Sequence, residues 1–278
     1  MTPRRRGLVG VALWVAASAP AWQARAAGRD CTLTPVLLEE FDEAAIASAR
    51  IGPARWTAHT PWNGDFGDAR FLDPGPNGPF AVGDGTLSIT ARKGPDGRWT
   101  SGLVAAADAS GAGTGALYGY FEARMKLPPG PGTWPAFWLA ALHPAADGAD
   151  ALLEVDVIEY YGQFPASYRS AWHVWRKPER AQAADHEIKV PEGALVADYH
   201  TYGVDISPTT MTFLLDGRPV WRQPTPAEHR FPLYPLVNLA LGSGWPIDRT
   251  PDPSTLRVDS VHVFSRGPGS DCPVGLGP

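Results

Sequence analysis

Three acidic residues stand close together in an otherwise apolar segment. Residues 152–162 read LLEVDVIEYYG and contain Glu154, Asp156 and Glu159. The Leu, Val, Ile and Tyr content predicts a β-strand, in which successive side chains point to opposite faces. Strict alternation would place Glu154 and Asp156 on one face and Glu159 on the other, in the core. An unpaired carboxylate buried there would strongly destabilise the fold.

One extra residue near Val157 and Ile158 removes this conflict. A β-bulge places two residues of one strand opposite a single residue of its neighbour, and it resets the alternation. We therefore expect a bulge between Asp156 and Glu159 that gathers all three carboxylates on one face.

Carboxylates this close repel one another, and the repulsion separates their pKa values. Glycoside hydrolysis needs such a pair, one ionised and one protonated. Carboxyl groups about 5 Å apart give retention of configuration through a covalent glycosyl-enzyme. From this strand alone, a calcium site and a solvated acidic face remain alternatives.

Aromatic residues accompany the acidic strand. The chain has 11 Trp, and the segment 132–140 (GTWPAFWLA) places Trp134 and Trp138 on one face of a second predicted strand. Further tryptophans occur at positions 172, 175 and 245. Aromatic rings supply apolar area with little loss of entropy and stack on sugar faces.

Short strands must position these groups. Runs typical of β-strands recur between Gly and Pro turn signals at 86–93, 118–127, 133–142, 152–161, 168–175, 199–207, 211–223, 235–242 and 256–264. Asp216-Gly217 marks a hairpin turn inside one of these runs. Because no alternation of strands with long helices is visible, the pattern predicts an all-β sandwich or barrel.

The ends of the chain indicate export. Residues 1–26 combine a basic start at Arg4–Arg6, an apolar run shorter than the ~18 residues of a membrane span, and Ala24-Arg25-Ala26, which is typical of a signal-peptidase site. We expect a cleaved signal peptide (1–26), one domain (27–278), a periplasmic or extracellular bacterial protein and no membrane partner. The only cysteines, Cys31 and Cys272, are expected to form a disulfide. A net charge of −5 without a basic cluster argues against nucleic-acid binding.

The order of several blocks resembles glycoside hydrolase family 16. They are DGTLSITA (84–91), GYFEARMKLPPGPGTWPAFWL (119–139), EVDVIEYYG (154–162), YHTYGVDIS (199–207), LLDG (214–217), LVNLALG (236–242) and VDSVHVF (258–264). The Glu-x-Asp-x-x-Glu spacing resembles the bulged, laminarinase-like form. The resemblance implies a β-sandwich jelly roll of two curved antiparallel sheets with an open concave cleft.

The resemblance also implies roles for residues. Glu154 would be the nucleophile, Glu159 the general acid and base, and Asp156 the residue between them that orients Glu154 and tunes its pKa. The other expected substrate-binding residues are Trp134, Trp138, His173, Asn63, Asn238 and Trp245. Residues 173–190 match no family motif and are expected to form a loop at the cleft edge. Catalysis would need no cofactor, while a structural Ca²⁺ would bind Glu40 and Asp259.

These expectations converge on an exported, monomeric, retaining endo-glycosidase. A β-1,3- or mixed β-1,3/1,4-glucan is the first expected substrate. The alternatives are a depolymerase of a bacterial exopolysaccharide or of an agar-type galactan, and a transglycosylase on the same scaffold. A non-catalytic carbohydrate-binding protein would be expected to lack at least one of the three carboxylates, and all three are present.

Overall fold

β-Strands are the main regular element of the described chain, which contains almost no helix. The computed structural model describes residues 33–43, 45–144, 151–176 and 179–267. The expected signal peptide and both cysteines lie outside these residues. Within them, no helix has the length and the apolar character needed to cross a membrane.

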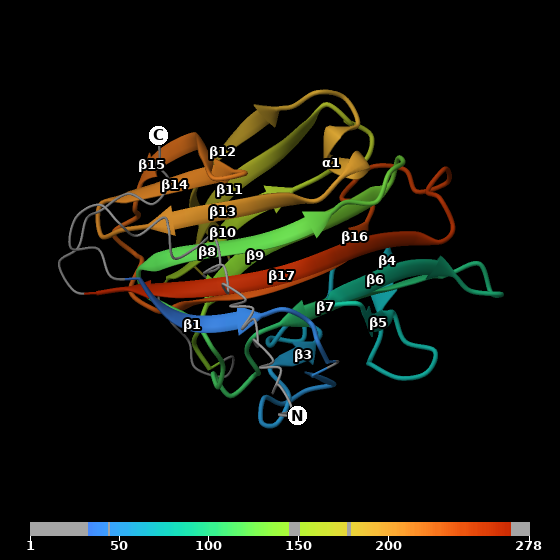
Figure 1. Ribbon diagram of the computed structural model, residues 1–278, viewed down its shortest axis with the longest axis horizontal. Coiled ribbons are helices and arrows are strands. Elements are labelled where there is room, and N and C mark those ends of the chain that lie inside the picture. The colour runs from blue at the N-terminus through green and yellow to red at the C-terminus, as the bar shows by residue number, and fades with distance from the viewer. Residues whose placement is uncertain (1–32, 44, 145–150, 177–178, 268–278) are drawn as a thin grey trace, which may run out of the picture.

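The first sheet forms one face of the molecule (Figure 1). Its strands, in spatial order, are β15 (Arg218–Pro224), β14 (Thr210–Leu215), β13 (His200–Ile206), β8 (Gly119–Lys126), β17 (Ser254–Arg266), β6 (Thr86–Lys93) and β5 (Phe80–Gly83), with β1 (Leu33–Glu39) beside the C-terminal half of β17. The first and last described strands are therefore neighbours.

The second sheet carries the acidic strand. Its strands, in spatial order, are β12 (Glu179–Lys189), β11 (Ser167–Arg176), β10 (Leu152–Glu159), β9 (Thr133–Ala141), β16 (Leu233–Leu241), β7 (Trp99–Ala105), β3 (Trp56–Ala58) and β2 (Ile46–Ala47). Pairing is antiparallel except between β2 and β3, and between β7 and the short β4 (Ala69–Phe71). One short helix, α1 (Ala194–Ala197), precedes β13.

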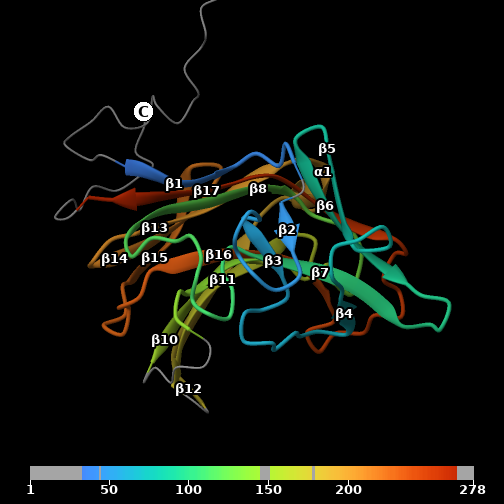
Figure 2. The same cartoon turned by 90° about the horizontal axis from the view of Figure 1, so that it is seen from below.

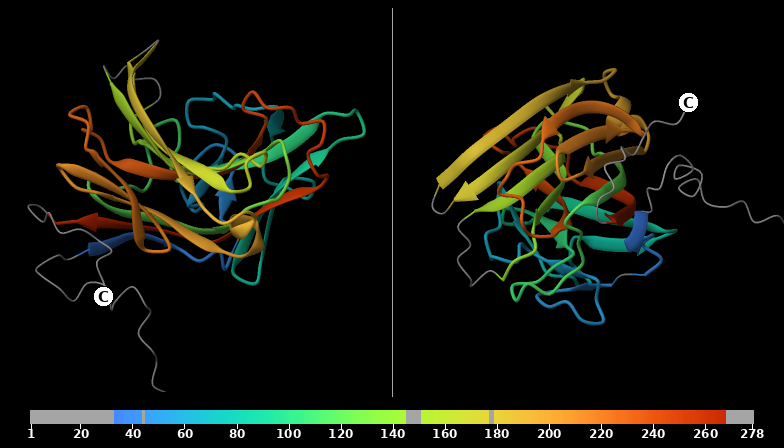
Figure 3. Two further views of the ribbon diagram at one scale, coloured as in Figure 1. Left: turned by 90° about the horizontal axis from the view of Figure 1, so that it is seen from above. Right: turned by 90° about the vertical axis from the view of Figure 1, so that its left-hand side faces the viewer.

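Two curved layers result, and the β11–β12 hairpin extends beyond the rest of the second sheet (Figures 2 and 3). The main core fills the space between the layers, where β8 contributes Phe121, Ala123 and Met125 from one face. A smaller apolar cluster covers the outer face of the second sheet and includes Trp138, Tyr234 and Phe71. Apolar residues on both faces explain why β9 and β16 are almost continuously buried. The all-β, jelly-roll expectation is confirmed.

The expected hairpin turn is present between β14 and β15. Asp216 and Gly217 have φ values of 50° and 75°, the left-handed conformation that a tight turn of this kind requires. The turn brings Trp221 of β15 beside Phe213 of β14, with ring centroids 4.8 Å apart.

Candidate active site

A β-bulge interrupts β10 where the acid spacing predicts it. The register with β11 shifts between Asp156 and Glu159, and the register with β9 shifts between Asp156 and Ile158. Val157 and Ile158 both point into the core between the sheets. The bulge thereby returns Glu159 to the outer face that Glu154 and Asp156 share, so this prediction is confirmed.

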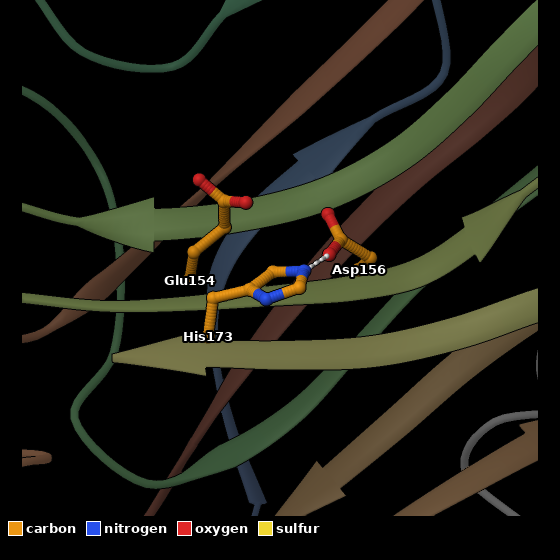
Figure 4. A group of neighbouring side chains, drawn as sticks. All are labelled: Glu154, Asp156 and His173. Carbon is orange, nitrogen blue, oxygen red and sulfur yellow. Dashed lines mark ion pairs between the residues drawn. The ribbon is translucent and has the colours of Figure 1, made fainter. Parts of the chain in front are cut away.

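His173 joins the acids from the neighbouring strand. It lies directly opposite Glu154 in the β10–β11 register. Its Nε2 is 3.1 Å from Oδ2 of Asp156 (Figure 4). One ligating atom from each of Glu154, Asp156 and His173 lies within 4.8 Å of the others. The expectation that His173 reaches the nucleophile side agrees with this placement.

Protein groups surround Glu154 closely. The Trp175 indole donates a hydrogen bond to its Oε2 at 3.1 Å. Burial and, after it, the charge of Asp156 raise the pKa of Glu154 to about 8, against a smaller opposing effect of His173. The pKa of Asp156 is also raised well above its ordinary value, first by burial and then by the charge of Glu159. The cluster therefore retains at least one proton near neutral pH, which acid catalysis requires.

Glu159 receives two hydrogen bonds on a single oxygen. Trp134 Nε1 donates to Oε1 at 3.1 Å, and the Tyr161 hydroxyl donates to the same atom at 3.0 Å. Sequence reasoning missed Tyr161 as a site residue. The available signal was its position two residues after Glu159, which the alternation of an extended segment places on the same face.

The alternatives to acid–base chemistry fit this site less well. Asp156 is only 6% exposed, so the acids do not form a solvated face. A calcium ion takes six to eight oxygen ligands. Here N–H and O–H donors from Trp175, Trp134 and Tyr161 already point at the carboxylates and occupy positions that a cation would need.

Two of the expected sugar-binding residues are buried. Trp138 is 5% exposed, and its indole donates to Asn238 Oδ1 at 2.8 Å. Asn238 is fully buried and donates from Nδ2 to the Trp134 carbonyl at 3.3 Å. Asn238 therefore fixes both tryptophans from beneath and does not border a cleft, which corrects the expectation. Trp138 presents little surface to a ligand because neighbouring aromatics cover it.

The covering residues come from the loop at 59–68, which also holds Asn63. Trp62 lies edge-on to Trp138 with ring centroids 5.9 Å apart, and Phe66 contacts both Trp134 and Trp138. Trp62 is 45% exposed, and the adjacent Asn63 adopts a positive φ of 55° in an exposed turn. The structure thus places Asn63 in the loop over the aromatic patch, with Trp62 as the exposed ring.

A cavity of about 380 Å³ lies on the Glu159 side of the acids. Its lining consists of Tyr161, Phe164, Ser167, Tyr168, Arg169, Glu187, Ser243 and Trp245. Trp245 is 43% exposed and meets Phe164 edge to face at 5.1 Å. Arg169 lies opposite Glu159 in the β10–β11 register. This volume falls within the range of small-molecule sites, and its mixture of rings and polar groups suits a sugar.

The remaining tryptophans of β11 point in opposite directions. Trp172 pairs with Val155 and packs against the main core. Trp175 pairs with Leu152, contacts Glu154 and is 39% exposed. Trp175, not Trp172, is therefore available beside the acids.

The segment at 173–190 is a strand hairpin, not the expected loop. After the β11 residues it continues as β12, which pairs with β11 along nearly its whole length. Arg176 and Gln182 both contact Oε1 of Glu228, at 3.0 and 3.1 Å, and His186 stacks on Trp221. These contacts attach the projecting hairpin to β15 and to the segment that follows it.

The expected calcium ligands have other partners. Glu40 Oε1 is 2.8 Å from Nε2 of His262, and Asp259 Oδ2 is 2.9 Å from Nη1 of Arg124. A guanidinium already neutralises Asp259, so these two carboxylates do not fit a shared Ca²⁺.

Comparison with known proteins agrees with the fold. The profile of glycosyl hydrolases family 16 matches residues 79–260. An endo-1,3-1,4-beta-glycanase, ExsH, from Rhizobium meliloti is 33% identical over 197 residues, which cover 67% of this chain and 40% of that protein. A beta-glucanase from Rhodothermus marinus is 29% identical, and the match covers 66% of this chain and 69% of that protein.

Solved structures show the same architecture. The laminarinase catalytic domain from Thermotoga maritima superposes with a TM-score of 0.68 at 21% identity, covering 84% of this chain and 98% of that one. The endo-beta-1,3-glucanase from Pyrococcus furiosus gives a TM-score of 0.68 at 24% identity, covering 85% and 96%. The chain spans about 40% of the length of the first two curated relatives, ExsH and EglC, both from Rhizobium meliloti.

Proposed function

This chain belongs to glycosyl hydrolases family 16, and on that premise we propose that it is a retaining endo-glycosidase acting on β-1,3- or mixed β-1,3/1,4-glucan. The observation that carries the proposal is the bulge in β10, which sets Glu154, Asp156 and Glu159 on one face. Relatives named endo-1,3-1,4-beta-glycanase and beta-glucanase support this substrate class.

The proposed roles of the carboxylates are those that the resemblance to family 16 implies. Glu154 attacks the anomeric carbon, while Glu159 gives its proton to the leaving oxygen and later removes one from the incoming water. A nucleophile must be ionised, so the reacting enzyme must keep its proton on Asp156 or Glu159. Burial and the charge of Asp156 raise the pKa of Glu154, while His173 and the Trp175 N–H oppose them and favour its ionised form. Burial of Asp156 favours its protonated form.

Exposed rings mark the sugar path on either side of the acids. Trp175 lies beside Glu154, and Trp245 lines the cavity on the Glu159 side. Because Glu159 protonates the leaving group, that cavity would receive the leaving part of the chain. Trp62 extends the apolar surface over Trp138.

Conservative substitutions test the proposal. Glu154→Gln and Glu159→Gln should each lower turnover of laminarin or lichenan by several orders of magnitude, since each removes a group that reacts. Glu192→Gln, in the exposed turn after β12, is the matched control and should keep full activity. Near-normal turnover by both site variants on every β-glucan would disprove the assignment.

Azide separates the two carboxylate roles. Added azide should rescue Glu154→Gly and yield an α-glycosyl azide, because it takes the place of the missing nucleophile. Recovery of the β-azide would transfer the nucleophile role to Glu159.

The competing substrates and acceptors need their own measurements. A reducing-sugar screen with laminarin, lichenan, curdlan, agar and bacterial exopolysaccharides distinguishes glucanase from exopolysaccharide or galactan depolymerase. Product analysis at high acceptor concentration distinguishes hydrolysis from transglycosylation.

The proposal includes the setting of the enzyme. Export is supported by the basic, apolar and small-residue pattern of residues 1–26, and a Cys31–Cys272 disulfide by the pairing of β1 with β17. The enzyme would act as a monomer on a polysaccharide, without a catalytic cofactor. Mass spectrometry of the secreted, unreduced protein tests the cleavage and the disulfide together.

A further inference from the structure

Tyr161 stands where β10 ends, beside the carboxylate that would act as the acid. Its hydroxyl and the Trp134 indole donate to the same oxygen, Glu159 Oε1, at 3.0 and 3.1 Å. The two rings stack with centroids 6.1 Å apart and planes 19° from parallel. Burial raises the pKa of Tyr161, so its hydroxyl keeps the hydrogen that it donates.

Two donors on one oxygen decide where the carboxyl proton can be. A protonated carboxyl group has one carbonyl oxygen, which accepts, and one hydroxyl oxygen, which donates. Oε1 accepts from both Tyr161 and Trp134, so it must be the carbonyl oxygen. The transferable proton then resides on Oε2.

We propose that Tyr161 is a positioning residue which, together with Trp134, fixes the acid proton of Glu159 on Oε2 and stabilises the carboxylate left after transfer. The proposal rests on the proposed function. As the glycosidic C–O bond breaks, its electron pair goes to the leaving oxygen, which takes the proton from Oε2. Glu159 becomes a carboxylate whose Oε1 keeps both donors.

The dependence on the leaving group provides the test. Tyr161→Phe keeps the ring and its stacking but removes the donor. For a β-glucan oligosaccharide, whose leaving group needs a proton, kcat/KM should fall about ten- to a hundredfold, the effect of one hydrogen bond to a charged group. For the matching glycosyl fluoride, whose leaving group needs little protonation, kcat/KM should stay within about twofold.

Two further variants complete the design. Tyr199→Phe is the control, because Tyr199 lies under Arg124 on the first sheet, and it should leave both substrates unaffected. Trp134→Phe removes the second donor and should show the same selective loss. The ratio of kcat/KM between the two substrates cancels any change in binding of the shared sugar, so this variant carries the test if Tyr161→Phe unfolds.

Each outcome distinguishes the two proposals. An equal loss on oligosaccharide and fluoride, or no loss on either, would overturn the role of Tyr161. A wild-type enzyme inactive on all glycosides would instead overturn the proposed function, and it would be recognised before any variant is made.

Discussion

At Glu154, the requirements of the fold and of the reaction oppose each other. The side chain lies among buried groups and beside a second carboxyl, which raises its pKa from an ordinary 4.5 to about 8. Folding therefore favours the protonated form, whereas nucleophilic attack needs the ionised form. Such conflicts between stability and activity are common at catalytic residues.

This conflict predicts how the free energy of unfolding changes with pH. Because the folded-state pKa of Glu154 is raised, its contribution to stability is fully present below about pH 4.5 and is lost as pH rises through about 8. The Glu154→Gln variant does not lose this stability, because glutamine does not ionise. Relative to wild type, the variant should gain at least about 1 kcal/mol between pH 5 and pH 8.5. Urea unfolding at the two pH values measures the difference.

The matched control is an exposed glutamate. Glu43→Gln, whose side chain is 74% exposed, should change stability equally at both pH values. A Glu154→Gln variant that lost stability relative to wild type as pH rose would contradict the raised pKa.

Among the elements, β10 depends for its function on the β-bulge, which adds one residue to the regular strand. Deleting Ile158 would leave the acids at even spacing, so all three would still face outward without a bulge. Glu159 would keep its place opposite Ala136, but the strand would lose the bend and the added twist of the bulge. We expect this loss to turn the Glu159 carboxylate away from the donors Trp134 and Tyr161. We expect the deletion to fold but to lose most of its activity.

Ile158→Ala shortens the buried side chain but keeps the bulge, so it distinguishes the effect of the side chain from the effect of the bulge. Ile158 is fully buried, so both changes should cost about 2–5 kcal/mol of stability. Only the deletion should remove activity, because the alanine variant keeps the bulge. Thermal unfolding and turnover of both variants provide the comparison, and equal turnover would show that the bulge does not position Glu159.

The same scale shows how far the sequence could predict the structure. Alternation predicted β6, β8 and β10 with their faces, and the odd acid spacing predicted the bulge. It could not predict that Trp138 is covered, because the covering loop at 59–68 is distant in sequence. It missed β12 because ERAQAADHEIK (179–189) is a polar edge strand without an apolar alternation.

The roles of side chains were predictable to the same extent, where neighbouring residues determine them and not where distant ones do. The three acids and His173 were predictable because one strand and its neighbour determine their faces. The prediction for Asn238 was wrong, and Glu40 and Asp259 have ionic partners that the sequence did not indicate, since a partner from another strand decides what each polar group does. For Asn238 that partner is Trp138, and for Asp259 it is Arg124.

In the molecule as a whole, His262 connects three strands of the first sheet. It lies on β17, with Nδ1 3.2 Å from Glu122 Oε1 on β8 and Nε2 2.8 Å from Glu40 Oε1 just after β1. Burial lowers the pKa of His262, but hydrogen bonds to the two carboxylates outweigh it and raise the pKa above its ordinary 6.5.

This cluster should make the fold more stable in mild acid. A raised histidine pKa gives stability that is fully present below about pH 6.5 and is lost as pH rises through the folded-state value. His262→Gln should therefore destabilise the protein by about 1 kcal/mol more at pH 5.5 than at pH 8.5, a modest effect because Glu40 is largely exposed. His200→Gln serves as the comparison, because His200 pairs with Asp216 on the same sheet. An equal loss at both pH values would show that His262 is not charged in the folded protein.

The pairing of β1 with β17 has a topological consequence. Leu33 lies opposite Arg266, so the two ends of the described chain are adjacent in this strand pair. The pair belongs to the first sheet, whereas the carboxylates lie on the second. A short peptide bridge could join these positions, and the resulting ring could be reopened at the β14–β15 turn. The acidic strand would then lie at a new place in the order of synthesis while keeping every neighbour. The site therefore depends on which strands are adjacent in space, and the position at which the chain starts is a separate choice.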